Sequence, residues 1–220
     1  TTGGGAISYY STTDSTNERI INSTFINNTA TYGGGAIYYY SGSPRNYSII
    51  NTTFIDNRAK YFGGAIYFSS LKDGILTNIT CINNRASIGG SAIFFIRECD
   101  NNEISNSIFV NNTGYTIYYY NPQTSGDRIV NSVFMNNDAV DIYASSPNVV
   151  ANYNWFGNNA SNYNLAQPYI NSPITLDTWL FLNATADESA IYTGDIHYVK
   201  FVLGAYNQSS TSIIDEDYDD

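Results

Sequence analysis

Apolar and polar positions along this chain recur as a unit with two halves. In the first half an aliphatic residue precedes Asn-x-x-Phe-x-x-Asn, and in the second half Gly-Gly-Ala-Ile precedes tyrosines. Residues 20–40, which read IINSTFINNTATYGGGAIYYY, contain both halves. The aromatic position recurs at 25, 54, 81, 109, 134 and 155, in steps of 21 to 29 residues. A period in this range predicts a solenoid in which each copy forms one coil.

Each copy contains short apolar clusters separated by Asn and Gly, without the apolar spacing of an amphipathic helix. We therefore predict an all-β fold, a right-handed parallel β-helix (solenoid) of about six coils with a short C-terminal β segment. The structural repeat positions are Asn22, Phe25, Asn28, Asn51, Phe54, Asn57, Asn78, Asn84, Asn106, Phe109, Asn112, Asn131, Phe134, Asn137, Asn152, Trp155 and Asn158, with Cys81 in the phenylalanine place of the third copy.

Three short strands are expected in each coil. The first ends on the aliphatic position, the second points the aromatic position inward, and the third points an isoleucine inward. The first-strand positions are Ile20, Ile49, Leu76, Ile104, Ile129 and Val150. The third-strand positions are Ile7, Ile37, Ile66, Ile93, Ile117 and Ile142. Inserts rich in Ser, Asp, Asn and Gly follow the third strand at 11–19, 41–47, 69–74, 97–103 and 121–128, and we expect loops there on one edge.

The asparagines and glycines of the repeat have structural explanations. An asparagine amide both donates and accepts, so asparagines stacked one coil apart can form a hydrogen-bonded ladder. Asparagine also tolerates the left-handed backbone of sharp turns, and glycine allows close approach between backbones. We therefore expect both asparagine columns to stabilise turns rather than to carry chemistry.

The repeat is expected to occupy residues 1–164, and residues 165–220 form a second, β-like segment. Gln167-Pro168 and Ser172-Pro173 mark the boundary between them. The chain opens on TTGGGAI, the second half of a unit. This start predicts either further coils upstream or self-association through an open solenoid end, because solenoid ends need covering.

The charge balance excludes several partners. Nineteen Asp and Glu against nine Lys and Arg give a net charge of −10, which disfavours nucleic acid and anionic membrane surfaces. No apolar run reaches the roughly 20 residues of a membrane span, so we expect no membrane insertion in this segment. Sequons begin at Asn22, Asn27, Asn46, Asn51, Asn78, Asn111, Asn159, Asn183 and Asn207, which leaves glycosylation open, as in a surface glycoprotein.

The pairing of Phe-x-x-Asn with Gly-Gly-Ala-Ile resembles the repeat of chlamydial polymorphic outer-membrane proteins. The fuller form, NSTFINNTA followed by GGAIY, resembles the adhesin-like proteins of methanogenic archaea, over roughly residues 1–160. Residues 175–203 resemble a cap and the opening strands of an immunoglobulin-like module, too short for a sandwich of about seven strands. These resemblances imply a secreted, extracellular cell-surface protein that attaches to glycans or proteins of another cell.

Two alternatives to an adhesin or adhesin-like stalk stay open. One is a structural filament or cell-envelope component, and the other is a polysaccharide lyase or glycoside hydrolase of the parallel β-helix type. Such enzymes need carboxylates close together, or carboxylates that hold Ca²⁺ beside a basic residue. Acidic residues here lie mostly in the inserts, and the only histidine is His197. We therefore expect no enzyme activity, no catalytic residue, no cofactor and no metal site.

The candidate contact surface follows from strand alternation. With Ile37 and Tyr39 inward, Tyr38 points outward. The equivalent residues of successive coils give a candidate contact stripe of Tyr38, Tyr67, Phe94, Tyr118 and Tyr143. Aromatic neighbours stabilise a sheet by about 0.2–1 kcal/mol per pair, which is one explanation of the stripe. A second explanation is contact with a ligand or partner, because long exposed apolar patches mark interaction sites. A third is that the inserts cover the stripe.

Overall fold

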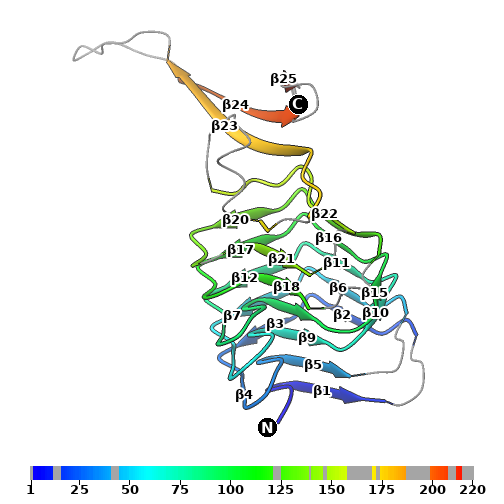
Figure 1. The fold of residues 1–220 in the computed structure, drawn as a ribbon. Helices are drawn as coiled ribbons and strands as arrows, with labels where there is room; N and C mark the ends of the chain where they lie inside the picture. The colour runs from blue at the N-terminus through cyan, green and yellow to red at the C-terminus, as the bar shows by residue number, and fades with distance from the viewer. Residues whose placement is uncertain are drawn as a thin grey trace, which may run out of the picture.

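The computed structural model describes residues 2–11, 16–40, 45–120, 125–138, 140–145, 148–157, 170–171, 174–186, 199–207 and 212–214. Within these ranges the chain is all-β and forms a right-handed parallel β-solenoid (Figure 1). His197 and Asn158 lie outside the described residues, and so does most of the stretch around the boundary predicted at residue 164.

The first wall of the solenoid is a six-stranded parallel sheet that carries the Gly-Gly-Ala-Ile half of the repeat. In stacking order its strands are β1 (Ile7–Tyr10), β5 (Ile37–Tyr40), β9 (Ile66–Phe68), β14 (Ile93–Phe95), β18 (Ile117–Tyr119) and β21 (Ile142–Ala144). The isoleucines predicted to form one inward column pair in register from Ile7 to Ile142. The predicted third strand is therefore confirmed.

Two further walls carry the first half of the repeat. One contains β2 (Arg19–Ile21), β6 (Ser48–Ile50), β11 (Ile75–Thr77), β16 (Glu103–Ser105), β19 (Asp127–Val130) and β22 (Val149–Val150). The other contains β3 (Thr24–Ile26), β7 (Thr53–Ile55), β12 (Thr80–Ile82), β17 (Ile108–Val110) and β20 (Val133–Met135). Phe25, Phe54, Cys81, Phe109 and Phe134 pair in register, so the predicted aromatic column is confirmed up to the fifth copy.

Short strands also form at two corners where loops or turns were expected. One corner has β4 (Thr29–Ala30), β8 (Arg58–Ala59) and β13 (Arg85–Ala86). The other has β10 (Leu71–Lys72) and β15 (Cys99–Asp100), inside inserts predicted as loops. That prediction was wrong for these two inserts because Leu71 and Cys99 are fully buried in the core. Burial of one apolar side chain in each insert is enough to bring its backbone into the parallel stack.

The last copy of the repeat is displaced by one residue. Trp155 pairs with Val133, and it is the Phe156 ring that stacks on Phe134, with centroids 5.4 Å apart. Positive φ likewise falls on Tyr153 instead of Asn152. The assignments of Trp155 to the aromatic column and of Asn152 to the turn were therefore wrong. A slip of one residue reverses which side chains face the core, and here it buries Phe156.

The core is a set of stacked aromatic columns. Phe25 and Phe54 rings stack 5.1 Å apart, and Phe109 and Phe134 rings stack 4.8 Å apart. Cys81 lies between these two pairs as a buried free thiol, and Cys99 is also free. The spacing of the rings follows the strand spacing of parallel coils.

Glycine is required where coils approach most closely. A Cβ on Gly64 would lie 2.1 Å from the carbonyl oxygen of Ser91 in the next coil. Ser91 occupies the same repeat position as Gly64, but the coil above it lacks the Gly-Gly turn. Glycine is therefore replaced by serine at the point where the next coil no longer has the tight turn.

Backbone pairing continues beyond the recognisable repeat. Isolated parallel bridges join Ile170 to Ile142, Thr175 to Val150 and Trp179 to Asn154. An antiparallel sheet of β23 (Thr178–Ala186), β24 (Val199–Asn207) and β25 (Ser212–Ile214) follows. The immunoglobulin-like assignment of residues 165–220 stays a prediction.

Candidate functional site

The second asparagine of each copy forms a buried ladder through the solenoid. Oδ1 of Asn84 accepts from the backbone N–H and from Nδ2 of Asn57, at 3.0 and 3.1 Å. Its Nδ2 donates to the Phe54 carbonyl at 3.0 Å and to Oδ1 of Asn112 at 3.1 Å. The same pattern joins Asn28, Asn57, Asn84, Asn112 and Asn137. The amides of Asn57, Asn84, Asn112 and Asn137 use both their oxygen and their nitrogen in these bonds, so this column stabilises the fold.

The first asparagine of each copy has a different role. Asn22, Asn51, Asn78, Asn106 and Asn131 are exposed and have φ between 50° and 53°. At the second turn the left-handed residue precedes the ladder asparagine, and these residues are Asn27, Asp56, Asn83, Asn111 and Asn136. Asparagine and aspartate tolerate this conformation better than other residues with a Cβ. Turn geometry therefore accounts for the first column.

Two buried carboxyl groups end the ladders. Oδ1 of Asp141 accepts from Nδ2 of Asn137 at 2.7 Å, at the end of the main ladder. Oδ1 of Asp127 accepts from the backbone N–H and Nδ2 of Asn102, at 2.8 and 3.0 Å, in a shorter ladder beside β10 and β15. Burial raises the pKa of Asp127 to about 8, against the hydrogen bonds from Asn102. Burial also raises the pKa of Asp141 to about 7, against the bond from Asn137.

Stability should therefore fall as pH rises from about 4 to about 8. In this window the folded state keeps a proton on Asp127 that the unfolded chain, with a carboxyl pKa near 3.8, has lost. Asp127→Asn keeps the acceptor oxygen and removes the ionisation. We expect its melting temperature to exceed that of the parent by several degrees at pH 8.5 and to match it near pH 4. The exposed Asp138→Asn is the control, and parallel melting profiles for parent and Asp127→Asn would contradict this assignment.

The predicted contact stripe forms a continuous aromatic row on the outside of the first wall. Ring centroids are 4.7 Å apart for Tyr38 and Tyr67, 5.4 Å for Tyr67 and Phe94, and 4.9 Å for Tyr118 and Tyr143. The expectation that the whole row is exposed was wrong, because Tyr67 is 3% exposed and Phe94 is fully buried. Tyr38, Tyr118 and Tyr143 are partly exposed.

A second aromatic layer covers the centre of the row. The chain folds back before each third strand, and an aromatic residue in this turn covers the row residue of the next coil. The Tyr32 ring centroid lies 6.0 Å from that of Tyr67, and the Phe62 ring centroid lies 4.5 Å from that of Phe94. Tyr115 covers Tyr143 in the same way, at 4.8 Å. In the sequence Tyr32 and Phe62 precede a Gly-Gly turn and Tyr115 follows the single Gly114, but strand alternation alone could not place these rings over the sheet.

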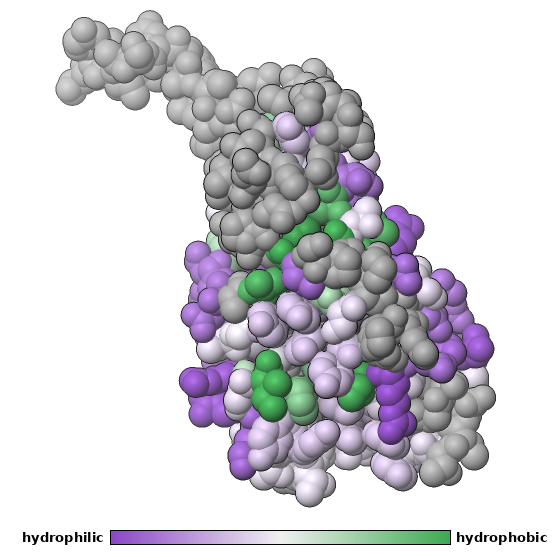
Figure 2. All heavy atoms as spheres, in the orientation of Figure 1, coloured by the Kyte–Doolittle hydropathy of each residue, from purple (hydrophilic) through white to green (hydrophobic). Residues whose placement is uncertain are grey.

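The exposed part of this surface is a rim two residues further along the strands. We call Tyr10, Tyr40 and Tyr120 the rim tyrosines, and sequence analysis did not single them out. Tyr10 is 70% exposed, Tyr120 is 53% exposed, and Tyr40 is partly exposed. Tyr10 and Tyr40 stack 4.9 Å apart, and Arg97 lies over the Tyr40 ring and donates to its hydroxyl. Figure 2 shows this face as a pale band of weakly polar residues with strongly hydrophilic residues at its margins.

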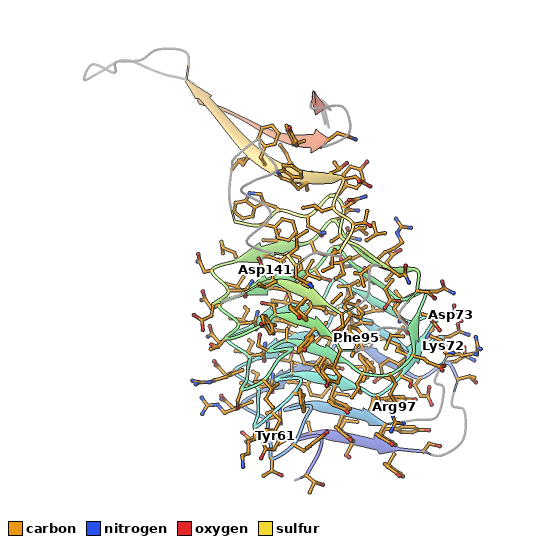
Figure 3. All side chains as sticks on the ribbon, viewed as in Figure 1. Tyr61, Lys72, Asp73, Phe95, Arg97 and Asp141 are labelled. Carbon is orange, nitrogen blue, oxygen red and sulfur yellow. The ribbon has the colours of Figure 1, made fainter. Side chains whose placement is uncertain are left out.

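Ion pairs in the described part of the chain gather at the edge formed by β10 and β15. Lys72 Nζ lies 3.0 Å from Glu98 and 3.4 Å from Asp100, and Arg45 lies 3.3 Å from Asp73. Figure 3 shows Lys72 and Asp73 side by side at this edge. Thus the exposed carboxylates here face cations, whereas Asp127 and Asp141, whose pKa values are raised, are 0% and 3% exposed. The described residues contain no group of three or more metal-ligating side chains.

Residues 22–40 and 51–69 match the Chlamydia polymorphic membrane protein repeat. Each matched segment begins at the first asparagine of a copy and ends on the aromatic first wall, and the match supports the repeat resemblance found in the sequence. No curated protein and no solved structure matches the chain. None of the described residues forms a helix long and apolar enough to cross a membrane. The repeat match and the solenoid together fit a surface, adhesin-like role.

Proposed function

We propose that this chain is a non-catalytic part of an extracellular cell-surface adhesin or adhesin-like stalk, and that the rim tyrosines contact glycans or proteins of another surface. The observation that carries the proposal is the exposed rim held on a rigid aromatic backing. The match to a membrane-protein repeat supports a surface location. The resemblance to adhesin-like proteins of methanogenic archaea belongs to the same proposal.

The aromatic backing matters because it fixes the rim before any contact is made. Tyr120 lies 5.9 Å from Tyr118 and 6.2 Å from the buried Phe94, and Tyr40 lies 6.3 Å from Tyr38. A tyrosine already held in one orientation loses little entropy on binding and offers both a flat face and a hydroxyl. Aromatic faces also suit the apolar faces of sugar rings.

Exposure of the sequons is compatible with a surface glycoprotein. The sequon asparagines at the turns of the solenoid are exposed and have positive φ, namely Asn22, Asn27, Asn46, Asn51, Asn78 and Asn111. Asn207, on strand β24, is partly buried. Glycans attached at the turns would project away from the first wall, and the rim tyrosines would stay accessible. Glycosylation at these turns is part of the proposal.

The absence of enzyme activity is proposed from the positions of the carboxyl groups. General acid catalysis of glycoside cleavage needs a carboxyl group of raised pKa that touches the substrate. Asp127 and Asp141 have raised pKa values but lie inside the ladders, where a polysaccharide cannot reach them. The exposed carboxylates Asp73, Glu98 and Asp100 instead lie beside Lys72 or Arg45.

The proposal is tested by adhesion of microspheres that display the chain. Microspheres carrying the parent should adhere to cells or to glycan-coated surfaces. Those carrying Tyr10/Tyr40/Tyr120→Ser should adhere at least about tenfold less, because aromatic anchors dominate contact energies. The matched control is Ile26/Ile75/Ile108→Ser, which removes exposed apolar side chains from the other two walls. It should adhere like the parent.

Three outcomes would count against the proposal in different ways. Equal adhesion by the folded tyrosine variant would move the contact surface away from the rim. Equal loss in both variants would indicate nonspecific apolar sticking. A parent that adheres to nothing on a broad panel would favour a structural filament or envelope component.

A further inference from the structure

An open groove lies at the corner formed by β4, β8 and β13. Its volume is about 320 Å³. Its polar and charged lining residues are Thr29, Thr31, Arg58, Lys60, Arg85 and Ser87. Three of the nine Lys and Arg residues of the chain therefore surround one groove, although the chain as a whole carries a net charge of −10. Sequence analysis did not identify this concentration of positive charge.

The two arginines are stacked in register. Arg58 pairs with Arg85 across β8 and β13, with Thr29 before them and Thr113 after them in the same column. Like charges directly opposite each other on neighbouring strands destabilise a sheet. Among the described residues, no ion pair or side-chain hydrogen bond joins either guanidinium, and both side chains are exposed. Asp56, only two residues from Arg58, forms no ion pair with it.

Three other cations of the described chain have protein partners. Arg45 and Lys72 face carboxylates across the coils, and Arg97 lies on the Tyr40 ring. In the basic groove, by contrast, Arg58 and Arg85 have no acidic partner among the described residues, and Lys60 lies against the Tyr61 ring. An anion bound between the two guanidinium groups would offset their repulsion.

The rest of the groove suits a sugar. Thr29 supplies a hydroxyl group, and the Ser87 hydroxyl donates to the Lys60 carbonyl. Lys60 Nζ lies 4.9 Å from the centroid of the Tyr61 ring, which holds the ammonium group at the groove margin. Figure 3 shows Tyr61 at this corner. The volume lies at the lower end of small-ligand sites, which fits one sugar unit inside the groove.

We infer that this groove binds one acidic unit of a saccharide, with its carboxylate or sulfate group between Arg58 and Arg85 and a hydroxyl group on Thr29. Arginine recognises such oxyanions through paired N–H donors, which a neutral sugar cannot engage. The site adds a ligand class to the proposed surface role without depending on it, because binding in solution requires neither a second cell nor the rim tyrosines.

The test is a calorimetric titration of the purified chain with four probes: an oligogalacturonate, a sulfated oligosaccharide, a neutral maltooligosaccharide and sodium sulfate. We expect at least one acidic oligosaccharide to bind, and to bind more tightly than both the neutral sugar and free sulfate. Raising the salt from about 50 mM to about 500 mM should weaken that binding, because exposed charges are screened.

Arg58→Gln/Arg85→Gln should weaken binding at least about tenfold, whereas Arg128→Gln, an exposed arginine on β19, should not change it. The double variant should melt no lower than the parent, because it removes like-charge repulsion. The inference is overturned if no acidic probe binds the parent, if the double variant binds like the parent, or if neutral and acidic sugars bind alike. Equal affinity for free sulfate and the acidic oligosaccharides would also overturn it, because the saccharide would then contribute nothing.

Discussion

Asn84→Ala is expected to lower the free energy of unfolding by about 3–5 kcal/mol, a large fraction of the 5–15 kcal/mol typical of a folded domain. The Asn84 side chain makes four hydrogen bonds, all of them buried. Its removal leaves the backbone N–H of Asn57 without its acceptor and the Phe54 carbonyl without this donor. Each unsatisfied buried group costs about 1–3 kcal/mol. Urea denaturation with circular dichroism would measure the change.

Asn83→Gly is the matched control for this variant. Asn83 is the exposed neighbour with φ of 56°, a conformation that glycine adopts without strain. Its free energy of unfolding should change by less than about 1 kcal/mol. If Asn84→Ala melted no lower than this control, the amide ladder would not be a main source of stability.

Phe54→Ala and Phe109→Ala should each lower the free energy of unfolding by about 3–5 kcal/mol. Both rings are fully buried and stack on a ring of an adjacent coil. Truncation leaves a cavity that the stacked coils cannot close, because the backbone ladders on both sides fix the strand spacing.

The phenylalanine variants have an internal control in Ile108→Ala. Ile108 is 43% exposed on the same strand as Phe109 but points away from the core. Its loss should cost less than half as much as the loss of Phe109. Similar effects for Ile108→Ala and Phe109→Ala would mean that β17 is in the wrong register.

The sequence predicted those features that depend on one residue type at a fixed repeat position. The inward isoleucine column, the aromatic column through Phe134 and the asparagine ladder all follow from stacking identical positions one coil apart. Backbone hydrogen bonds between parallel strands set the spacing of the coils, and these bonds do not depend on which side chains the inserts contain.

Features that depend on how a segment folds over its neighbours were not predictable in this way. Strand alternation points Tyr67 outward. However, the turn before β5, in the previous coil, places the Tyr32 ring over Tyr67, which is buried. The basic groove depends on the two-residue strand β8. Asn-x-Ala recurs at this corner in three copies, but the repeat does not show that Arg58 and Arg85 line a groove. The one-residue shift of the last copy could not be predicted because Trp155 and Phe156 are both aromatic. Only the pairing of Trp155 with Val133 shows which of the two faces the core.

The central claim is that the solenoid holds a surface ligand without chemically changing it. The most direct measurement follows adhesion of parent-coated microspheres to one polysaccharide surface over hours while the released carbohydrate is analysed. The account predicts stable adhesion with no new reducing ends and no unsaturated fragments. Release of such fragments, at a rate that rises with the amount of chain on the microspheres, would contradict the claim and make the protein an enzyme.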